Sequence, residues 1–311
     1  MTKLTLTLFL LGTGFIWAQK DVFDSILQHD LQAVNQFFKD GGNIDQKKSR
    51  KVDQSLSKKH SKEAIEVSLF EYAINGIRSA QDAKDPSLIR DAYAIMDTLL
   101  GRLDQSAERQ SLLNKTFTFA ISLSNVELVR KLHQMGADIN QRCDLCYGRT
   151  PALIAVALNE DLEMIKFLFS LNPDFGIKDY DNRGYLHYAA VNGNIPLLEY
   201  LLDNKIEDIN VKDTIGRTPI FDAVLQGDIE TYNFLLSRGA KTDVVVNGDI
   251  SLLDEASTTG DLNFFRQVYY TSGLPINEET FPKSELKKHV WDSEILIFIE
   301  REIAFTKLQN N

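Results

Sequence analysis

The sequence lacks the residue patterns that would mark an enzyme or a metal site. It has no phosphate-binding loop, no Gly-x-Ser-x-Gly elbow, no His-Glu-x-x-His motif and no recognisable pair of catalytic carboxylates. Its five histidines share no spacing typical of metal ligands. We therefore expect no catalytic residue, no bound metal and no cofactor.

The chain also has fewer positively charged than negatively charged residues. The chain has 34 Lys and Arg against 44 Asp and Glu, a formal net charge of −10. A field of this sign opposes binding to nucleic acid and to anionic lipid. The exception is the stretch 47–62, which is basic and almost free of apolar residues. Its composition predicts a solvated loop, with a site for an anionic ligand as the less favoured alternative.

Long hydrophobic runs are absent after the first residues. Lys3 precedes an uncharged, largely apolar run from Leu4 to Trp17, which is too short to span a bilayer comfortably. We interpret residues 1–18 as a secretory signal peptide, with a retained membrane anchor as the alternative. The closing Trp-Ala-Gln resembles bacterial export signals. We therefore expect an exported monomer, periplasmic or secreted, that has no membrane contact after cleavage.

The sequence does contain a regular internal repeat. Four alanines stand 34, 34 and 33 residues apart, and two of them follow the sequence Gly-Arg-Thr-Pro. A glycine turn recurs after three of them, and Gly136 opens the pentapeptide Gly-Ala-Asp-Ile-Asn. These features closely resemble the ankyrin repeat, which has a period near 33 residues and the signature Thr-Pro-Leu-His-x-Ala. The four alanines are Ala155, Ala189, Ala223 and Ala256.

The resemblance implies an all-α repeat solenoid of stacked helix-turn-helix units with extended finger loops. Following the period outward predicts about seven repeats over 20–283 and a polar-faced helical cap over 284–311. Two intervals, from Ile26 to Ala73 and from Ala73 to Ala120, are each 47 residues long. We place the additional residues in exposed loops, as insertions at 47–62 and 78–86.

Several repeated residues have structural roles in this interpretation. Thr150 and Thr218 precede prolines at expected helix starts, where a threonine can accept a backbone N–H. The small alanines allow the first helices to stack closely. His187 occupies the histidine position of the signature, and the resemblance implies a hydrogen-bonding residue that ties adjacent loops together.

Cys143 and Cys146 are the only cysteines. They lie in a finger that is about two residues longer than the others, and in an oxidising compartment they should pair with each other. Free thiols are one alternative, and redox activity or metal binding is another. The strand-to-helix context of a thioredoxin-like site and two further zinc ligands are both missing.

The resemblance implies a non-enzymatic scaffold that binds a partner protein through a concave face of finger tips and first helices. A protective or immunity role is one form of this function. The alternatives are a redox-responsive factor that uses Cys143 and Cys146, and an effector secreted to act in a host. Tyrosine and arginine are favoured interface anchors. The family's contact positions correspond here to Tyr147, Arg149, Tyr180, Asp181, Arg183, Tyr188, Thr214, Ile215, Arg217, Asp222 and Gln226.

Overall fold

A computed structural model describes residues 22–50, 65–158, 161–277, 279–281, 290 and 292–309. The expected signal peptide, most of the basic stretch and the expected first helix of the cap lie outside the described residues. The chain divides into two compact units, Met1–Asp138 and Ile139–Asn311. Each unit is described by itself.

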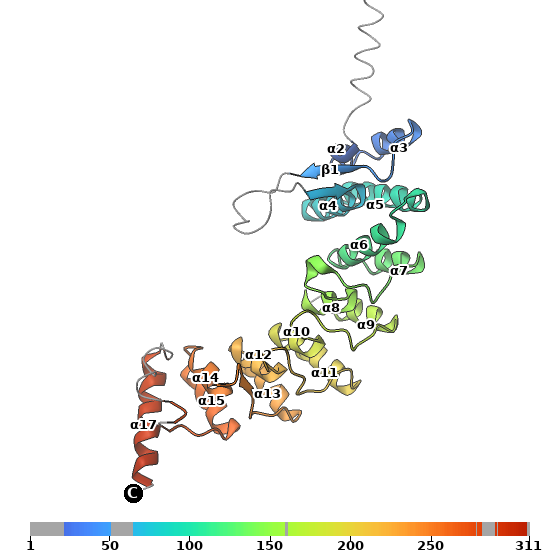
Figure 1. Cartoon of the computed structure of the whole chain (residues 1–311). Coiled ribbons are helices and arrows are strands. Elements are labelled where there is room, and N and C mark those ends of the chain that lie inside the picture. The colour runs from blue at the N-terminus through green and yellow to red at the C-terminus, as the bar shows by residue number, and fades with distance from the viewer. Residues whose placement is uncertain are drawn as a thin grey trace, which may run out of the picture. The chain divides into compact units, whose positions relative to one another are not determined.

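The described part of the first unit has three helix pairs and one hairpin (Figure 1). The first helices of consecutive pairs pack on each other, α2 on α4 and α4 on α6. The hairpin strands β1 and β2 pair antiparallel, with Lys47 opposite Ser68. The elements are α2 (Val22–Leu27), α3 (Leu31–Lys39), β1 (Lys47–Arg50), β2 (Ile65–Ser68), α4 (Leu69–Ala83), α5 (Pro86–Leu100), η1 (Leu103–Gln105), α6 (Arg109–Ile121) and α7 (Val126–Gln134).

The expectation of an exposed loop at 78–86 is wrong. Helices α4 and α5 have 15 residues each, whereas α10 and α11 of the second unit have seven and nine. The eight and six additional residues together account for the excess of 14 over one period. Ala73, Ile77 and Ala80 are all buried, so the helical pattern simply continues. The side chain of Asp85 then caps α5.

The expected loop at 47–62 begins as a strand. Lys47–Arg50 forms β1, and Lys47 Nζ lies 2.8 Å from Glu108 Oε1. Backbone pairing does not require apolar side chains, and the partner strand β2 contributes the β-branched residues Ile65 and Val67. The prediction for residues 51–62 lies outside the described residues.

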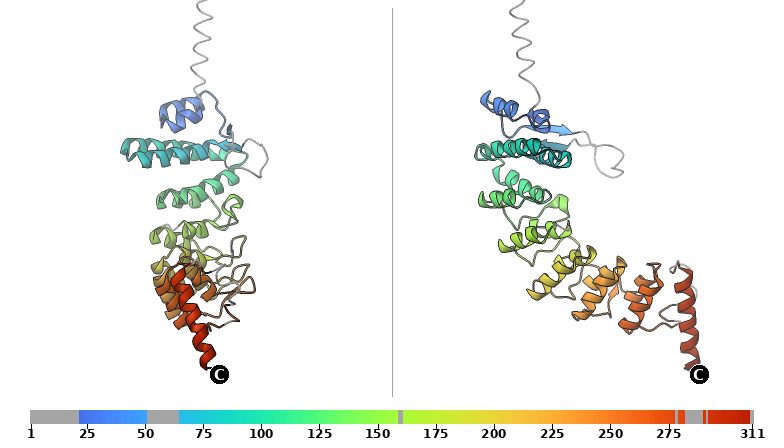
Figure 2. Two further views of the ribbon diagram at one scale, coloured as in Figure 1. Left: turned by 90° about the vertical axis from the view of Figure 1, so that its left-hand side faces the viewer. Right: turned by 180° about the vertical axis from the view of Figure 1, so that it is seen from behind.

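In its described residues the second unit has four helix pairs followed by a final helix, seen in chain order in Figure 2. The four repeated alanines are fully buried where the first helices α8, α10, α12 and α14 stack on each other. The fold is the all-α repeat solenoid that the period predicts. The elements are η2 (Asp144–Cys146), α8 (Pro151–Ala157), α9 (Leu162–Ser170), α10 (Tyr185–Val191), α11 (Ile195–Asp203), α12 (Pro219–Leu225), α13 (Ile229–Ser237), β3 (Val245–Val246), β4 (Ile250–Ser251), α14 (Leu252–Ser257), α15 (Leu262–Ser272) and α17 (Ser293–Gln309).

Local chemistry accounts for the turns between paired helices. The recurring glycines Gly193, Gly227 and Gly260 have φ of 63°, 67° and 75°, the left-handed region that favours glycine. The residue that follows each of them caps the next helix with its side chain. At the starts of first helices Thr150 caps α8 as expected, whereas the Thr218 side chain makes no cap hydrogen bond.

The expected polar-faced cap exposes a mixed face. Helix α17 packs one face on α15, where the Phe298 ring centroid lies 5.9 Å from that of Phe265. Its exposed residues include large apolar side chains, with Leu308 at 78% of its surface, beside four charged ones. The apolar ones are Ile297, Phe305 and Leu308, and the charged ones are Glu294, Glu300, Arg301 and Lys307. Leu286 and Trp291, expected to face inward, lie outside the described residues.

Candidate functional site

Each first helix of the second unit is preceded by a finger. We number these loops as the first finger (141–149), second finger (175–183), third finger (209–217) and fourth finger (243–249). Backbone hydrogen bonds join each finger to the next, which makes one continuous row. The bonds run from Tyr180 N to Tyr147 O (3.2 Å), from Thr214 N to Asp181 O (2.8 Å) and from Asn247 N to Ile215 O (3.0 Å).

Buried aspartates close the second and third fingers. Asp179 and Asp213 are only 5% and 8% exposed, and each side chain accepts two backbone N–H bonds from its own finger. One of the two donors is the N–H of Arg183 or Arg217, at 2.8 Å in both fingers. The carboxylate thereby fixes the turn and the start of the arginine side chain. We did not predict this role, although both aspartates stand 34 residues apart and four before an arginine.

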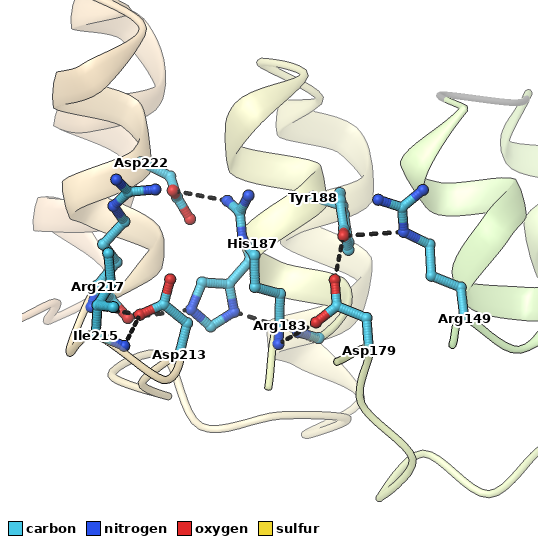
Figure 3. A network of polar contacts seen from close by, with 10 residues as sticks. Arg149, Asp179, Arg183, His187, Tyr188, Asp213, Ile215, Arg217 and Asp222 are labelled. Atoms are coloured by element: carbon cyan, nitrogen blue, oxygen red, sulfur yellow. Dashed lines mark hydrogen bonds and ion pairs between the residues drawn. The ribbon is translucent and has the colours of Figure 1, made fainter. Parts of the chain in front are cut away.

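The arginines of the first and second fingers reach the first helix of the next unit (Figure 3). Arg149 Nε donates to Tyr188 Oη at 2.9 Å, and its guanidinium lies 4.7 Å from the centre of the Tyr188 ring. Arg183 Nη2 donates to Asp222 Oδ1 at 2.8 Å, and the guanidinium carbon of Arg183 lies 5.2 Å from the centre of the Tyr188 ring. The Tyr188 hydroxyl in turn donates to Asp179. Fingers and helices are thus joined by charge and by aromatic contact.

Burial changes the role of two predicted contact residues. Asp222 is fully buried and Tyr188 is 8% exposed, so neither can meet a partner directly, and both support the fingers instead. Burial raises the pKa of Asp222 to about 6 and, with the hydrogen bond to Asp179, raises the pKa of Tyr188 to about 12. Sequence position alone could not separate these two residues from exposed ones.

His187 has the structural role that the repeat signature implies. Its Nδ1 accepts from Gly184 N at 3.3 Å, which leaves Nε2–H to donate to the carbonyl of Arg217 at 3.2 Å. Burial lowers the pKa of His187 to about 4, so the ring is neutral near pH 7. Both ring nitrogens serve the backbone, and the expected tie between adjacent loops is confirmed.

An exposed aromatic group lies at the junction of the first and second fingers. Tyr147 and Tyr180 are 46% and 51% exposed, with ring centroids 5.6 Å apart. The Tyr147 hydroxyl donates to Asp181 Oδ1 at 3.1 Å, and the Tyr180 hydroxyl donates to Asp144 Oδ1 at 2.5 Å. Each tyrosine is therefore held by the finger of the other. We call these four residues the tyrosine tip.

The other predicted contact residues lie on the fingers, apart from Gln226, which follows α12. Thr214 and Gln226 are exposed, whereas Arg149, Arg183, Ile215 and Arg217 are half-buried. Sequence reasoning missed Val245 of the fourth finger, which is 46% exposed between the buried Val244 and Val246. A run of three valines favours a strand, in which alternate side chains point to opposite faces, and this signal could have revealed it.

The two cysteines form the expected disulfide, Cys143–Cys146. Backbone hydrogen bonds close the same loop, from Cys143 N to Arg149 O at 3.0 Å and from Gly148 N to Cys143 O at 2.9 Å. Within the described ranges, no group of three or more His, Cys, Asp or Glu side chains could hold a metal ion. In that same part of the chain, no helix combines the length and apolar character needed to cross a membrane.

Comparison with known proteins identifies the repeat. A family model for ankyrin repeats in three copies matches residues 117–213 and 153–247. The chain is 34% identical over 129 residues to a putative ankyrin repeat protein of fowlpox virus. The match covers 40% of this chain and 30% of the viral protein. It is 30% identical over 152 residues to a probable 26S proteasome regulatory subunit of Saccharomyces cerevisiae, covering 48% and 65% of the two chains.

A third relative is the phosphocholine transferase AnkX of Legionella pneumophila, which is 29% identical over 147 residues. The match covers 46% of this chain and 15% of the transferase. The chain thus spans less than two thirds of the length of each of these relatives. Residues 117–247 of this chain are thus ankyrin repeats.

Proposed function

We propose that this protein is an exported scaffold that binds a partner protein through the finger row of its second unit. Ankyrin repeats are interaction modules and are generally not enzymatic, so the chain is a protein-binding scaffold and its partners are proteins. The finer proposal concerns the surface. Contact is made by the tyrosine tip and by the exposed residues Thr214, Val245 and Gln226. No catalytic step by this chain is part of the proposal.

The observation that carries this proposal is the tyrosine tip. Two large aromatic side chains stand about half exposed, yet each is held by a hydrogen bond to the neighbouring finger. Tyrosine supplies a large contact area with few rotatable bonds, and a side chain already fixed loses little conformational entropy when a partner binds. Such residues are typical interface anchors.

The affinity of a captured partner tests this surface. We expect Tyr147→Ala and Tyr180→Ala each to weaken binding by at least about tenfold, since hot-spot tyrosines contribute more than about 1.4 kcal/mol. The matched control is Tyr270→Ala, because Tyr270 is 70% exposed on α15 and outside the finger row. A partner that loses affinity equally with the control, or keeps full affinity for both tip variants, would contradict the proposed surface.

Export is the second component of the proposal, and it is supported by the apolar run that follows Lys3. We propose a monomer that acts in the periplasm or after secretion, with protection against a partner enzyme or toxin as one role. Cell fractionation, together with mass spectrometry of the mature N-terminus, tests this directly. We expect a new N-terminus near Gln19 and a periplasmic location. Recovery from host cells would favour a secreted effector, and an uncleaved N-terminus would contradict the signal peptide.

A further inference from the structure

The first finger is closed differently from its neighbours. In the second and third fingers a buried aspartate, Asp179 or Asp213, accepts two backbone N–H bonds. The corresponding position of the first finger, 34 residues before Asp179, is Leu145, which has no carboxylate. Here the Cys143–Cys146 disulfide spans that position instead. A covalent bond has taken the place of the hydrogen bonds that the aspartate side chain accepts in the other two fingers.

We propose that this disulfide is a redox switch for the tyrosine tip. When it is closed, it holds the first finger in the shape on which the second finger docks. When a dithiol reductant opens it, the first finger loosens and the tip loses its fixed geometry. The inference rests on the proposed function, because it concerns control of the same surface. The third and fourth fingers, which follow the second in the row, are not affected.

The tip depends closely on the shape of the disulfide loop. Asp144, which accepts the Tyr180 hydroxyl, lies inside the loop, and Tyr147 follows it immediately. Tyr147 has φ of 63° and Gly148 has φ of 74°, so two consecutive residues lie in the left-handed region. A tyrosine adopts this conformation only when its surroundings fix it. The loop supplies that constraint.

The second finger lies directly against this turn. A Cβ atom placed on Gly148 would come within 2.5 Å of the Tyr180 ring. Tyr180 N also donates to the Tyr147 carbonyl at 3.2 Å. A change in the backbone at 147–148 therefore displaces Tyr180 as well, and both rings of the tip move together.

The chemistry of the switch is ordinary thiol–disulfide exchange. Cys143 and Cys146 are both partly exposed, so a small dithiol can reach them. A reductant thiolate attacks one sulfur and releases the other cysteine as a thiolate, which takes up a proton. The second reductant thiolate then displaces the remaining cysteine, and the reductant leaves as a disulfide. Two electrons and two protons pass to the protein. Opening so short a loop should raise the frequency of local unfolding by about tenfold.

Amide hydrogen exchange of the full chain, measured by NMR with and without dithiothreitol, tests the switch without any partner. We expect the Gly148 and Tyr180 amides to exchange about tenfold faster after reduction, while the Thr214 and Asn247 amides keep their rates. The double variant Cys143→Ser, Cys146→Ser should match the reduced protein and be insensitive to dithiothreitol. Equal rates at Gly148 and Tyr180 in both redox states would overturn the inference, as would equal acceleration in all four fingers.

Partner binding separates failure of the switch from failure of the proposed function. If the tyrosine variants abolish binding but reduction changes neither exchange nor affinity, the surface is right and the switch is wrong. If reduction speeds exchange at Gly148 and Tyr180 but the tyrosine variants bind normally, the first finger is redox-sensitive but the proposed binding surface is wrong. If the binding surface and the redox switch are both right, reduction should lower partner affinity and reoxidation should restore it.

Discussion

Replacing Asp222 with asparagine tests how the buried network responds to pH. Asp222 is fully buried on α12, where its Oδ1 accepts from Arg183 Nη2 at 2.8 Å. Its other carboxylate oxygen has no hydrogen-bond partner in the described part of the chain. The variant Asp222→Asn keeps the shape of the side chain and an oxygen that can accept from Arg183. It removes only the ability to carry a negative charge.

The magnitude follows from the pKa of this carboxyl group. Burial raises the pKa of Asp222 from 3.8 to about 6. In the folded state the group therefore holds its proton over a pH range in which the unfolded chain has already lost it. Stability then falls as the pH rises through this range. A pKa difference of about two corresponds to about 3 kcal/mol, so Asp222→Asn should gain about 3 kcal/mol relative to wild type between pH 4 and pH 7.

Urea unfolding followed by circular dichroism measures this difference. Both proteins are unfolded at a series of pH values from 4 to 7, and only the difference in free energy of unfolding is interpreted. Every other titrating group is common to both proteins, so its contribution cancels. A difference that stays constant from pH 4 to pH 7 would refute the reasoning, because it would show that Asp222 has the same pKa in the folded and unfolded chains.

Three further predictions concern the same unit. In urea unfolding, Gly148→Ala should destabilise the unit by about 1–2 kcal/mol more than Gly260→Ala. Both glycines have φ near 75°, but of the two only Gly148 has another side chain, 2.5 Å away, where a Cβ would lie. Ala189→Leu should lower stability by about 1–3 kcal/mol by overpacking the fully buried interface between first helices, and an unchanged urea midpoint would contradict that packing. Burial lowers the pKa of His187 to about 4, so this histidine should stay neutral down to about pH 5 in an NMR titration. As the pH falls from 6.5 to 4, the wild-type protein should therefore lose about 3 kcal/mol of stability relative to His187→Gln.

The period predicts several structural features that repeat at fixed spacing. Buried alanines, glycine turns and the backbone bonds of His187 all depend on residues within one unit or at the junction with the next. Their spacing near 34 residues therefore locates them without a structure. The period does not predict the lengths of individual helices and loops. A period that is too long by 14 residues shows that material has been added, but it does not show whether the addition is a loop or, as at 78–86, two longer helices.

The sequence could not predict which residues of the site are buried. Tyr188 and Asp222 belong to residue types that favour interfaces, and they occupy positions that face a partner in related arrays. Each is buried here because an arginine 39 residues earlier in the chain reaches it, Arg149 in one case and Arg183 in the other. The length and direction of that reach depend on where two units stack. The amino-acid composition does not predict such a distance.

The reach of the arginines also determines how each finger is supported. Arg149 belongs to the first finger but makes its contacts on α10, and Arg183 belongs to the second finger but makes its contacts on α12. His187 of α10 likewise bonds the carbonyl of Arg217 in the third finger. A finger is therefore held in place largely by the unit that follows it. The shape of a binding surface on any one finger is a property of two adjacent repeats, and substitutions in a helix that no partner touches can alter it.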